Sequence, residues 1–138
     1  MDTQDLHERG LTLRRKMFGG EAVDKRTQAA GEFGAPLQHI INAYAYGDVW
    51  SRGALPLKTK SLAMLGITAA LNRPAEFKVH VNGALANGAT QDEIRDILLL
   101  VALYCGIPAA NDAHRIAHET FEERASARTR TQEQGDAA

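Results

Sequence analysis

Apolar residues recur at helical spacing along most of the chain, and no segment alternates apolar and polar residues as a half-buried strand does. Residues Thr3 to Phe18 carry a weak apolar face among charges, and Gly19-Gly20 ends this helical pattern. A short helical segment is expected near Glu21 to Ala30. A stronger helix follows and is expected to end near Gly47, because apolar residues share one of its faces: Phe33, Leu37, Ile40, Ile41, Tyr44 and Ala45.

The second half of the chain contains clearer starts and stops. The segment "GDVWSRGALPLKT" has the glycines and the proline of a loop and leads to a helix expected over "LKTKSLAMLGITAALN". Pro74 suits the first turn of the next helix, and Asn87-Gly88 suits its end. Thr90 and Glu93 have the spacing of a capping box ahead of "IRDILLLVALYCG". A last helix is expected to begin near "IPAANDAH".

These elements predict an all-α fold, a compact bundle of about six or seven helices that forms a single domain over residues 1–124. Residues 125–138 lack large apolar side chains, so a disordered, solvated tail is expected there. Two segments, Ser61–Leu71 and Ile94–Cys105, are apolar nearly all round and should be central and buried. Because this is more apolar surface than a small monomer usually hides, we expect a homo-oligomer.

Composition narrows the possible functions only a little. The 138 residues suffice for one compact domain, and a net charge of -1 gives no electrostatic reason to expect nucleic acid as a partner. No apolar run reaches the length of a membrane helix, and the polar start differs from a signal peptide, so no membrane partner and a cytoplasmic location are expected. The single cysteine, Cys105, excludes an intramolecular disulfide and a thiolate-cluster metal site. We expect Cys105 to be a small buried hydrophobe, with a nucleophilic role as the alternative.

One polar stripe stands out at the start of the helix that follows "LN". Arg73, Glu76 and His80 lie three and four residues apart and therefore share a helix face. In one interpretation, Glu76 only complements the helix dipole and His80 is a satisfied, half-buried histidine. In the other, the Glu76 carboxylate orients the His80 imidazole and favours its protonated form, so that the pair exchanges protons, while Arg73 binds an anion. Spacing alone leaves both interpretations open.

Two further sets of residues could carry chemistry. His114 and His118 are four residues apart and could bind a metal, but the companion acid of the zinc-protease motif is missing because Arg115 follows His114; packing or partner contacts are the alternative. In "YGDVWSRG", Trp50 could wall a pocket to which Arg52 supplies a cation, or Trp50 could be a core or interface anchor.

The run from "AYAYGDVWSRGALPLKTK" through "NRPAEFKVH" to "YCGIPAANDAH" resembles the carboxymuconolactone decarboxylase family, and the similarity extends from Leu11 to Phe121. The wider alkylhydroperoxidase D-like superfamily includes proteins with a redox CxxC pair followed four residues later by a histidine. With His80 aligned to that histidine, the cysteine positions fall on Arg73 and Glu76. The resemblance therefore argues against peroxidase activity and for non-redox chemistry at this helix.

The resemblance also implies an activity and its residues. It implies a carboxy-lyase of protocatechuate catabolism, in the β-ketoadipate pathway, which converts 4-carboxymuconolactone to 3-oxoadipate enol-lactone without a cofactor or metal, as a homotrimer or homohexamer. In this hypothesis His80 is the general acid and Glu76 orients it, while Arg73, Arg52 and Trp50 bind the small anionic lactone. The alternatives are a related decarboxylase or lactone-processing enzyme with another substrate, or a non-catalytic helical oligomer.

Overall fold

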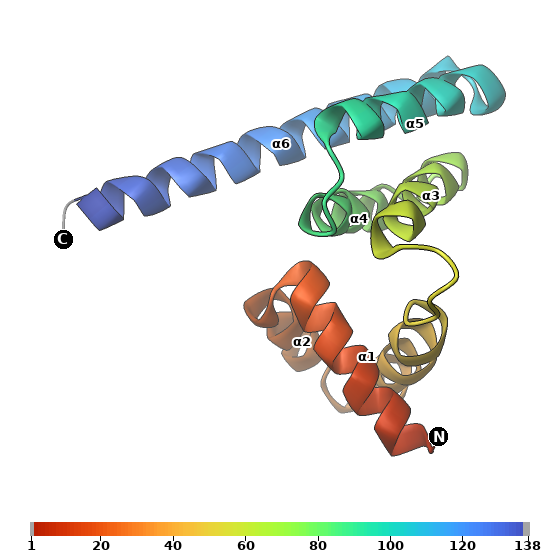
Figure 1. Cartoon of the computed structure of the whole chain (residues 1–138), viewed down its shortest axis with the longest axis vertical. Coiled ribbons are helices and arrows are strands. Elements are labelled where there is room, and N and C mark those ends of the chain that lie inside the picture. Colours follow the sequence, from red (N-terminus) through yellow and green to blue (C-terminus); the bar gives the residue numbers. More distant parts are fainter. Residues whose placement is uncertain (1, 137–138) are drawn as a thin grey trace. The chain divides into compact units, whose positions relative to one another are not determined.

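A computed structural model describes residues 2–136, and these residues contain helices, turns and loops but no strand (Figure 1). The predicted all-α fold is confirmed. Along the chain the elements are α1 (Thr3–Phe18), α2 (Gly20–Ile40), the π-helical segment η1 (Ile41–Val49), α3 (Leu57–Ala70), α4 (Pro74–Ala86), α5 (Gln91–Cys105) and α6 (Ile107–Asp136). None of the helices within residues 2–136 is long and apolar enough to cross a membrane.

The described residues divide into two compact units. Unit 1 contains residues 2–61 and 86–88, and unit 2 contains residues 62–85 and 89–136. Each unit is described by itself below. The single domain expected over residues 1–124 stays a prediction.

In unit 1, helix α1 packs closely against η1 because two glycines leave room for the backbones. A β-carbon added at Gly10 would overlap the carbonyl oxygen of Asn42, and one added at Gly47 would overlap the carbonyl oxygen of Leu6. The buried face of α1 carries Gly10, Arg14 and Met17, which are spaced by one helical turn each. Glycine at both contact points therefore fixes how α1 lies along η1.

Helix α2 consists of two helical pieces that meet at a kink. Gly31 has φ 58° and ψ −157°, a conformation outside the helical region that glycine adopts without steric cost. This kink agrees with the expected change from a short segment ending near Ala30 to a stronger helix. The stronger helix was expected to end near Gly47, but it continues as η1 to Val49. Its last turns are π-helical, as the hydrogen bond from the Trp50 N–H to the Ala45 carbonyl shows (2.8 Å).

Unit 2 has one apolar core to which four helices contribute. Leu65 of α3, Phe77 and Val81 of α4, and Ile94 and Leu98 of α5 are each at most 1% exposed, and residues of α6 close the cluster: Ala110, Ala113, Ile116 and Ala117. The predicted capping box begins α5, since the Thr90 and Glu93 side chains each accept a hydrogen bond from the other residue's backbone N–H. α5 and α6 pack against each other (Figure 1).

The prediction that two segments are buried nearly all round is wrong for the single chain. Each of the two segments buries one face and exposes large apolar side chains on the other, namely Ile67, Leu71, Leu99, Leu100, Leu103 and Tyr104. On α2 and η1 the expected apolar face is also solvent-exposed at Phe33, Leu37, Ile40 and Tyr44. Helical spacing identified these faces correctly, but one chain alone provides nothing that covers them.

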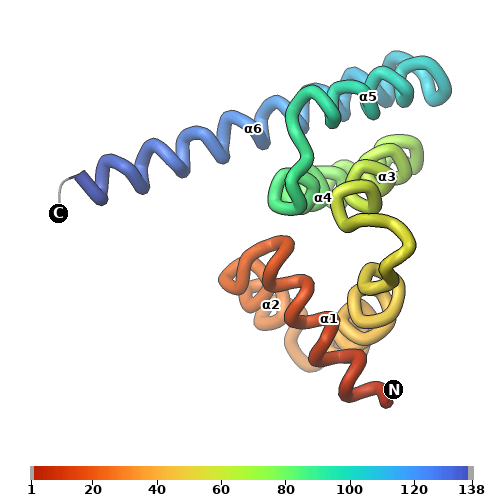
Figure 2. Tube along the Cα trace, viewed as in Figure 1, coloured from red at the N-terminus to blue at the C-terminus, as the bar shows by residue number. Residues whose placement is uncertain are grey.

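Helix α6 is the longest element and continues well beyond the core of unit 2. Figure 2 shows it as one uninterrupted coil at the C-terminal end of the trace. Residues 126–136 are exposed, in agreement with their lack of large apolar side chains. They are helical as far as Asp136, however, where a disordered tail was expected over residues 125–138; residues 137–138 lie outside the described residues.

Candidate functional site

The start of α4 is defined by backbone hydrogen bonds around Arg73. The Arg73 N–H donates to the Thr68 carbonyl (2.9 Å), and the Arg73 carbonyl accepts from the Phe77 N–H (2.8 Å). Asn72 before it has φ 55°, a left-handed conformation that asparagine tolerates better than most residues. Pro74 then occupies the first helical position, where a missing N–H costs nothing. The local sequence "NRP" therefore sets where the polar stripe begins.

His80 and Glu76 lie one turn apart on α4 in very different environments. His80 is 2% exposed, on the same buried side as Phe77 and Val81, whereas the Glu76 side chain is 61% exposed. The Nε2 atom of His80 lies 3.8 Å from the Oε2 atom of Glu76. This distance is longer than a hydrogen bond, so the contact between the two side chains is electrostatic.

Arg73 is the exposed end of the stripe. Within residues 2–136 its guanidinium makes no hydrogen bond or ion pair, so its donors are available to an external anion. The structure thus brings Glu76 and His80 close together on α4, as their spacing predicted, and Arg73 is exposed directly before the first residue of this helix. The cation and the carboxylate are exposed, and the imidazole is buried.

Polar contacts to α6 hold the part of α4 that carries His80. Two residues before His80, Lys78 forms an ion pair with Glu123 (2.9 Å). Two residues after it, Asn82 accepts a hydrogen bond from Arg124 (3.2 Å). Together with the buried Phe77 and Val81, these contacts fix the rotation of α4 about its axis within unit 2.

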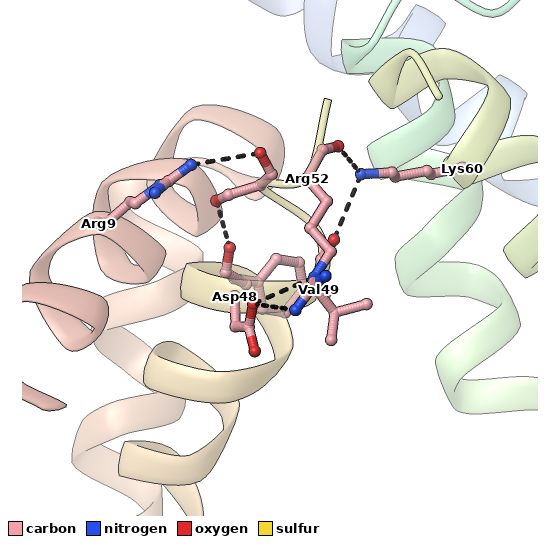
Figure 3. Close-up of polar contacts among 7 residues, drawn as sticks. Arg9, Asp48, Val49, Arg52 and Lys60 are labelled. Atoms are coloured by element: carbon pink, nitrogen blue, oxygen red, sulfur yellow. Dashed lines mark hydrogen bonds and ion pairs between the residues drawn. The ribbon is translucent and has the colours of Figure 1, made fainter. Parts of the chain in front are cut away.

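Trp50 and Arg52 line a cavity of about 490 Å³ in unit 1. The other lining residues come from α1 and from the loop before α3, and they are Arg9, Thr12, Leu13, Lys16, Ser51, Gly53, Leu55, Pro56 and Leu57. The Arg52 guanidinium donates twice to Oδ1 of Asp48, at 3.2 and 3.0 Å (Figure 3). Trp50 and Arg52 therefore line the same cavity, and their role in binding a ligand stays a prediction.

An aromatic stack holds Trp50 in place. Its ring stacks on Tyr46 with ring centroids 5.5 Å apart, and Phe18 of α1 packs edge-on against Tyr46 at 5.8 Å. Arg14 lies over the Tyr46 ring at 5.7 Å and is itself buried, donating a hydrogen bond to Oδ1 of Asn42 (2.6 Å). No sequence pattern predicts this stack, because its members come from segments whose register depends on the Gly10 and Gly47 contact.

Lys60 makes contacts that the sequence did not predict. Its Nζ atom donates to the backbone carbonyls of Val49 (3.3 Å) and Arg52 (Figure 3). It also donates to the backbone carbonyl of Trp50 (3.0 Å). One ammonium group thereby satisfies three carbonyls of the loop that carries Trp50 and Arg52. Arg9 also holds this loop, through a hydrogen bond to the Ser51 carbonyl (3.3 Å). A lysine near a loop with no periodic pattern carries no signal that would predict such a contact.

The remaining candidates do not form a reactive cluster. His114 Nδ1 is hydrogen-bonded to the Ala110 carbonyl (2.8 Å), and His118 pairs with Glu122 (3.0 Å). In the described part of the chain, no group of three or more His, Cys, Asp or Glu residues is arranged to hold a metal ion. Cys105 is exposed, so the expectation of a small buried hydrophobe is wrong; it follows Leu103 and Tyr104 on the uncovered side of α5.

Comparisons with known proteins agree with this helix arrangement. The chain is 33% identical to 4-carboxymuconolactone decarboxylase of Acinetobacter baylyi over 89% of its own length and 92% of that protein. It is 34% identical to nitrosuccinic acid decarboxylase of Metarhizium robertsii over 84% of its length and 81% of that protein. The model of the carboxymuconolactone decarboxylase family matches residues 35–119, which include Trp50, Arg52 and the whole of α4. The chain therefore belongs to the carboxymuconolactone decarboxylase family.

Proposed function

We propose that this protein is a cofactor-free carboxy-lyase whose substrate is a small anionic lactone, 4-carboxymuconolactone, which it converts to 3-oxoadipate enol-lactone in protocatechuate catabolism. The observation that carries the proposal is the buried His80 imidazole 3.8 Å from the exposed Glu76 carboxylate, at a helix start that also presents Arg73. The name of the Acinetobacter relative supplies the substrate. The protein is further proposed to act in the cytoplasm and as a homo-oligomer.

Decarboxylation of the lactone requires a group that delocalises one electron pair and a group that donates one proton. When the carboxylate leaves as carbon dioxide, the electron pair that remains on the ring carbon spreads through the ring double bond into the lactone carbonyl. The resulting dienolate is protonated at the ring carbon next to the carbonyl. Because the lactone carries its own electron sink, the reaction does not require the delocalisation that pyridoxal or thiamine cofactors supply.

His80 is proposed to deliver that proton as a general acid, a role worth about 10²–10⁴-fold in rate. Glu76 favours the imidazolium form and, being exposed, connects the buried ring with solvent, from which the ring regains a proton. Arg73 is proposed to bind a substrate carboxylate, since it is exposed directly before the helix that carries this pair. The roles proposed for Arg52 and Trp50, an anion contact and an apolar wall, are supported by the cavity of unit 1 alone.

A second substrate class is supported by one specific observation. The Metarhizium relative is named for decarboxylation of nitrosuccinic acid, which is also a small carboxylic acid with an electron-withdrawing group. The decisive assay offers purified protein both compounds in parallel and follows carbon dioxide release, with loss of ultraviolet absorbance for the lactone. Turnover of the lactone supports the proposal, and turnover of nitrosuccinate alone assigns the other substrate. Release from neither compound favours a different substrate or the non-catalytic oligomer.

A further inference from the structure

The lining of the unit 1 cavity is strongly cationic. The roles proposed for Trp50 and Arg52 do not account for its other cationic residues. Arg9 and Lys16 line it together with Arg52, and none of its lining residues is acidic. Its volume of about 490 Å³ lies within the range of about 300–1,000 Å³ that is common for small-molecule sites. All of its lining residues belong to unit 1.

Arg9 and Lys16, the two cationic residues that α1 contributes to the lining, form no ion pair within residues 2–136. Arg9 uses one guanidinium nitrogen on the Ser51 carbonyl, which is neutral, so its positive charge is not offset. Lys16 makes no hydrogen bond or ion pair within residues 2–136. Arg52, by contrast, is already paired with Asp48. The cavity therefore presents two uncompensated positive charges, which suits a ligand with two carboxylates.

The cavity also offers an apolar surface, held rigidly in place. Trp50 is stacked on Tyr46, and Lys60 clamps the loop carbonyls on both sides of Ser51. Leu13, Leu55, Pro56 and Leu57 add aliphatic surface to the lining. A flat, unsaturated ligand can lie against such a wall while its charged ends reach the cations, and a preorganised site loses little entropy when it binds.

We propose that this cavity binds a small, flat dicarboxylate, with Arg9 and Lys16 as binding residues for its negative charge and Trp50 as the surface for its body. The inference deepens the proposed function, on which it rests for the ligand's identity as substrate. Arg9, Thr12, Leu13 and Lys16 are spaced i, i+3, i+4 and i+7, so they form one stripe of α1 that faces the cavity.

The test measures binding directly, without turnover. Trp50 is the only tryptophan of the chain, so its fluorescence reports on this cavity alone. The probe is maleate, a small flat dicarboxylate, and its control is maleamide, which has the same shape without charge. We expect a saturable fluorescence change with maleate only, with an apparent Kd that rises about tenfold in Arg9→Gln and again in Lys16→Gln. The matched controls Arg26→Gln and Lys25→Gln, which change exposed cations outside the lining, should bind maleate like the wild type.

Several outcomes would overturn the inference: no saturable change with maleate, equal binding of maleamide, or unaltered maleate affinity in both cavity variants. Because all four residues are exposed, the substitutions should leave circular dichroism unchanged. If maleate binds as described but the wild type decarboxylates no lactone, the proposed function fails and this inference stands. If the lactone is turned over with an unchanged KM in Arg9→Gln and Lys16→Gln, the inference fails and the proposed function stands.

Discussion

The Nε2 atom of His80 lies 3.8 Å from the Oε2 atom of Glu76, and the two side chains differ sharply in exposure. If His80 is the general acid, Glu76 acts through His80 and does not contact the substrate. A carboxylate one turn away favours the protonated ring. Glu76→Gln keeps the shape of the side chain and removes its charge. We expect it to lower kcat, by less than the loss from replacing His80 itself.

Steady-state kinetics with the lactone measure this effect of Glu76→Gln, and Glu21→Gln is the matched control because Glu21 is an exposed carboxylate of α2 in unit 1. A kcat for Glu76→Gln equal to that of the control would show that Glu76 only complements the dipole of α4. The spacing of Arg73, Glu76 and His80 alone left open this interpretation, in which Glu76 has no role in catalysis.

Arg52→Ala tests whether the cavity of unit 1 binds substrate. Loss of one charge-assisted contact of about 1.5–3 kcal/mol should raise KM by about tenfold or more while kcat changes little. Arg26→Ala, which removes an exposed arginine outside the lining, should leave KM unchanged. Should KM also stay unchanged in Arg52→Ala, then Arg52 serves to hold Asp48 and the loop rather than the substrate.

The close approach of α1 and η1 predicts a large effect from very small substitutions. A methyl group at Gly10 or Gly47 overlaps backbone atoms, which cannot move aside as a flexible side chain can. Gly10→Ala and Gly47→Ala should therefore each lower the free energy of unfolding by about 1–3 kcal/mol, measured by urea denaturation. Gly135→Ala is the control, because nothing lies near that position, and it should be neutral or slightly stabilising. Wild-type stability of both contact variants would contradict the packing of α1 against η1.

The exposed apolar side of α5 predicts self-association. Leu103 and Tyr104 are 72% and 81% exposed in the single chain, and Leu99, Leu100 and Ile107 are exposed as well. If copies of the chain cover this face, Leu103→Glu should lower the oligomer mass in sedimentation equilibrium, because it buries a charge at the contact. Gln132→Glu, an exposed change on α6, is the control and should keep the wild-type mass. A wild-type chain that sediments as a monomer would contradict the predicted homo-oligomer.

Much of the fold could be predicted because it depends on local signals. Pro74 begins α4, Gly88 follows its end, and the Thr90 and Glu93 capping box begins α5, each through backbone chemistry that a few neighbouring residues determine. Helical spacing also identified the apolar faces. It could not tell which faces stay uncovered in one chain, so α5 and Cys105 were expected to be buried.

The candidate site could be predicted only in part, for the same reason. The stripe of Arg73, Glu76 and His80 lies on one helix, so its spacing was sufficient to find it. The cavity around Trp50 depends on how α1 packs against η1, which follows from two glycines whose roles no periodicity reveals. Arg9 and Lys16 are two turns apart, so their spacing predicts that they share one face of α1. Only the structure shows that this face lines the cavity.

The central claim is that His80 protonates the substrate, and the rate of carbon dioxide release by His80→Gln tests it most directly. Glutamine is close in size to histidine, and circular dichroism with sedimentation verifies that the variant keeps its fold and assembly; His80→Asn serves as the second variant if it does not. If His80 is the proton donor, kcat should fall by about 10²–10⁴-fold with the fold intact. A folded variant that releases carbon dioxide at nearly the wild-type rate would contradict it.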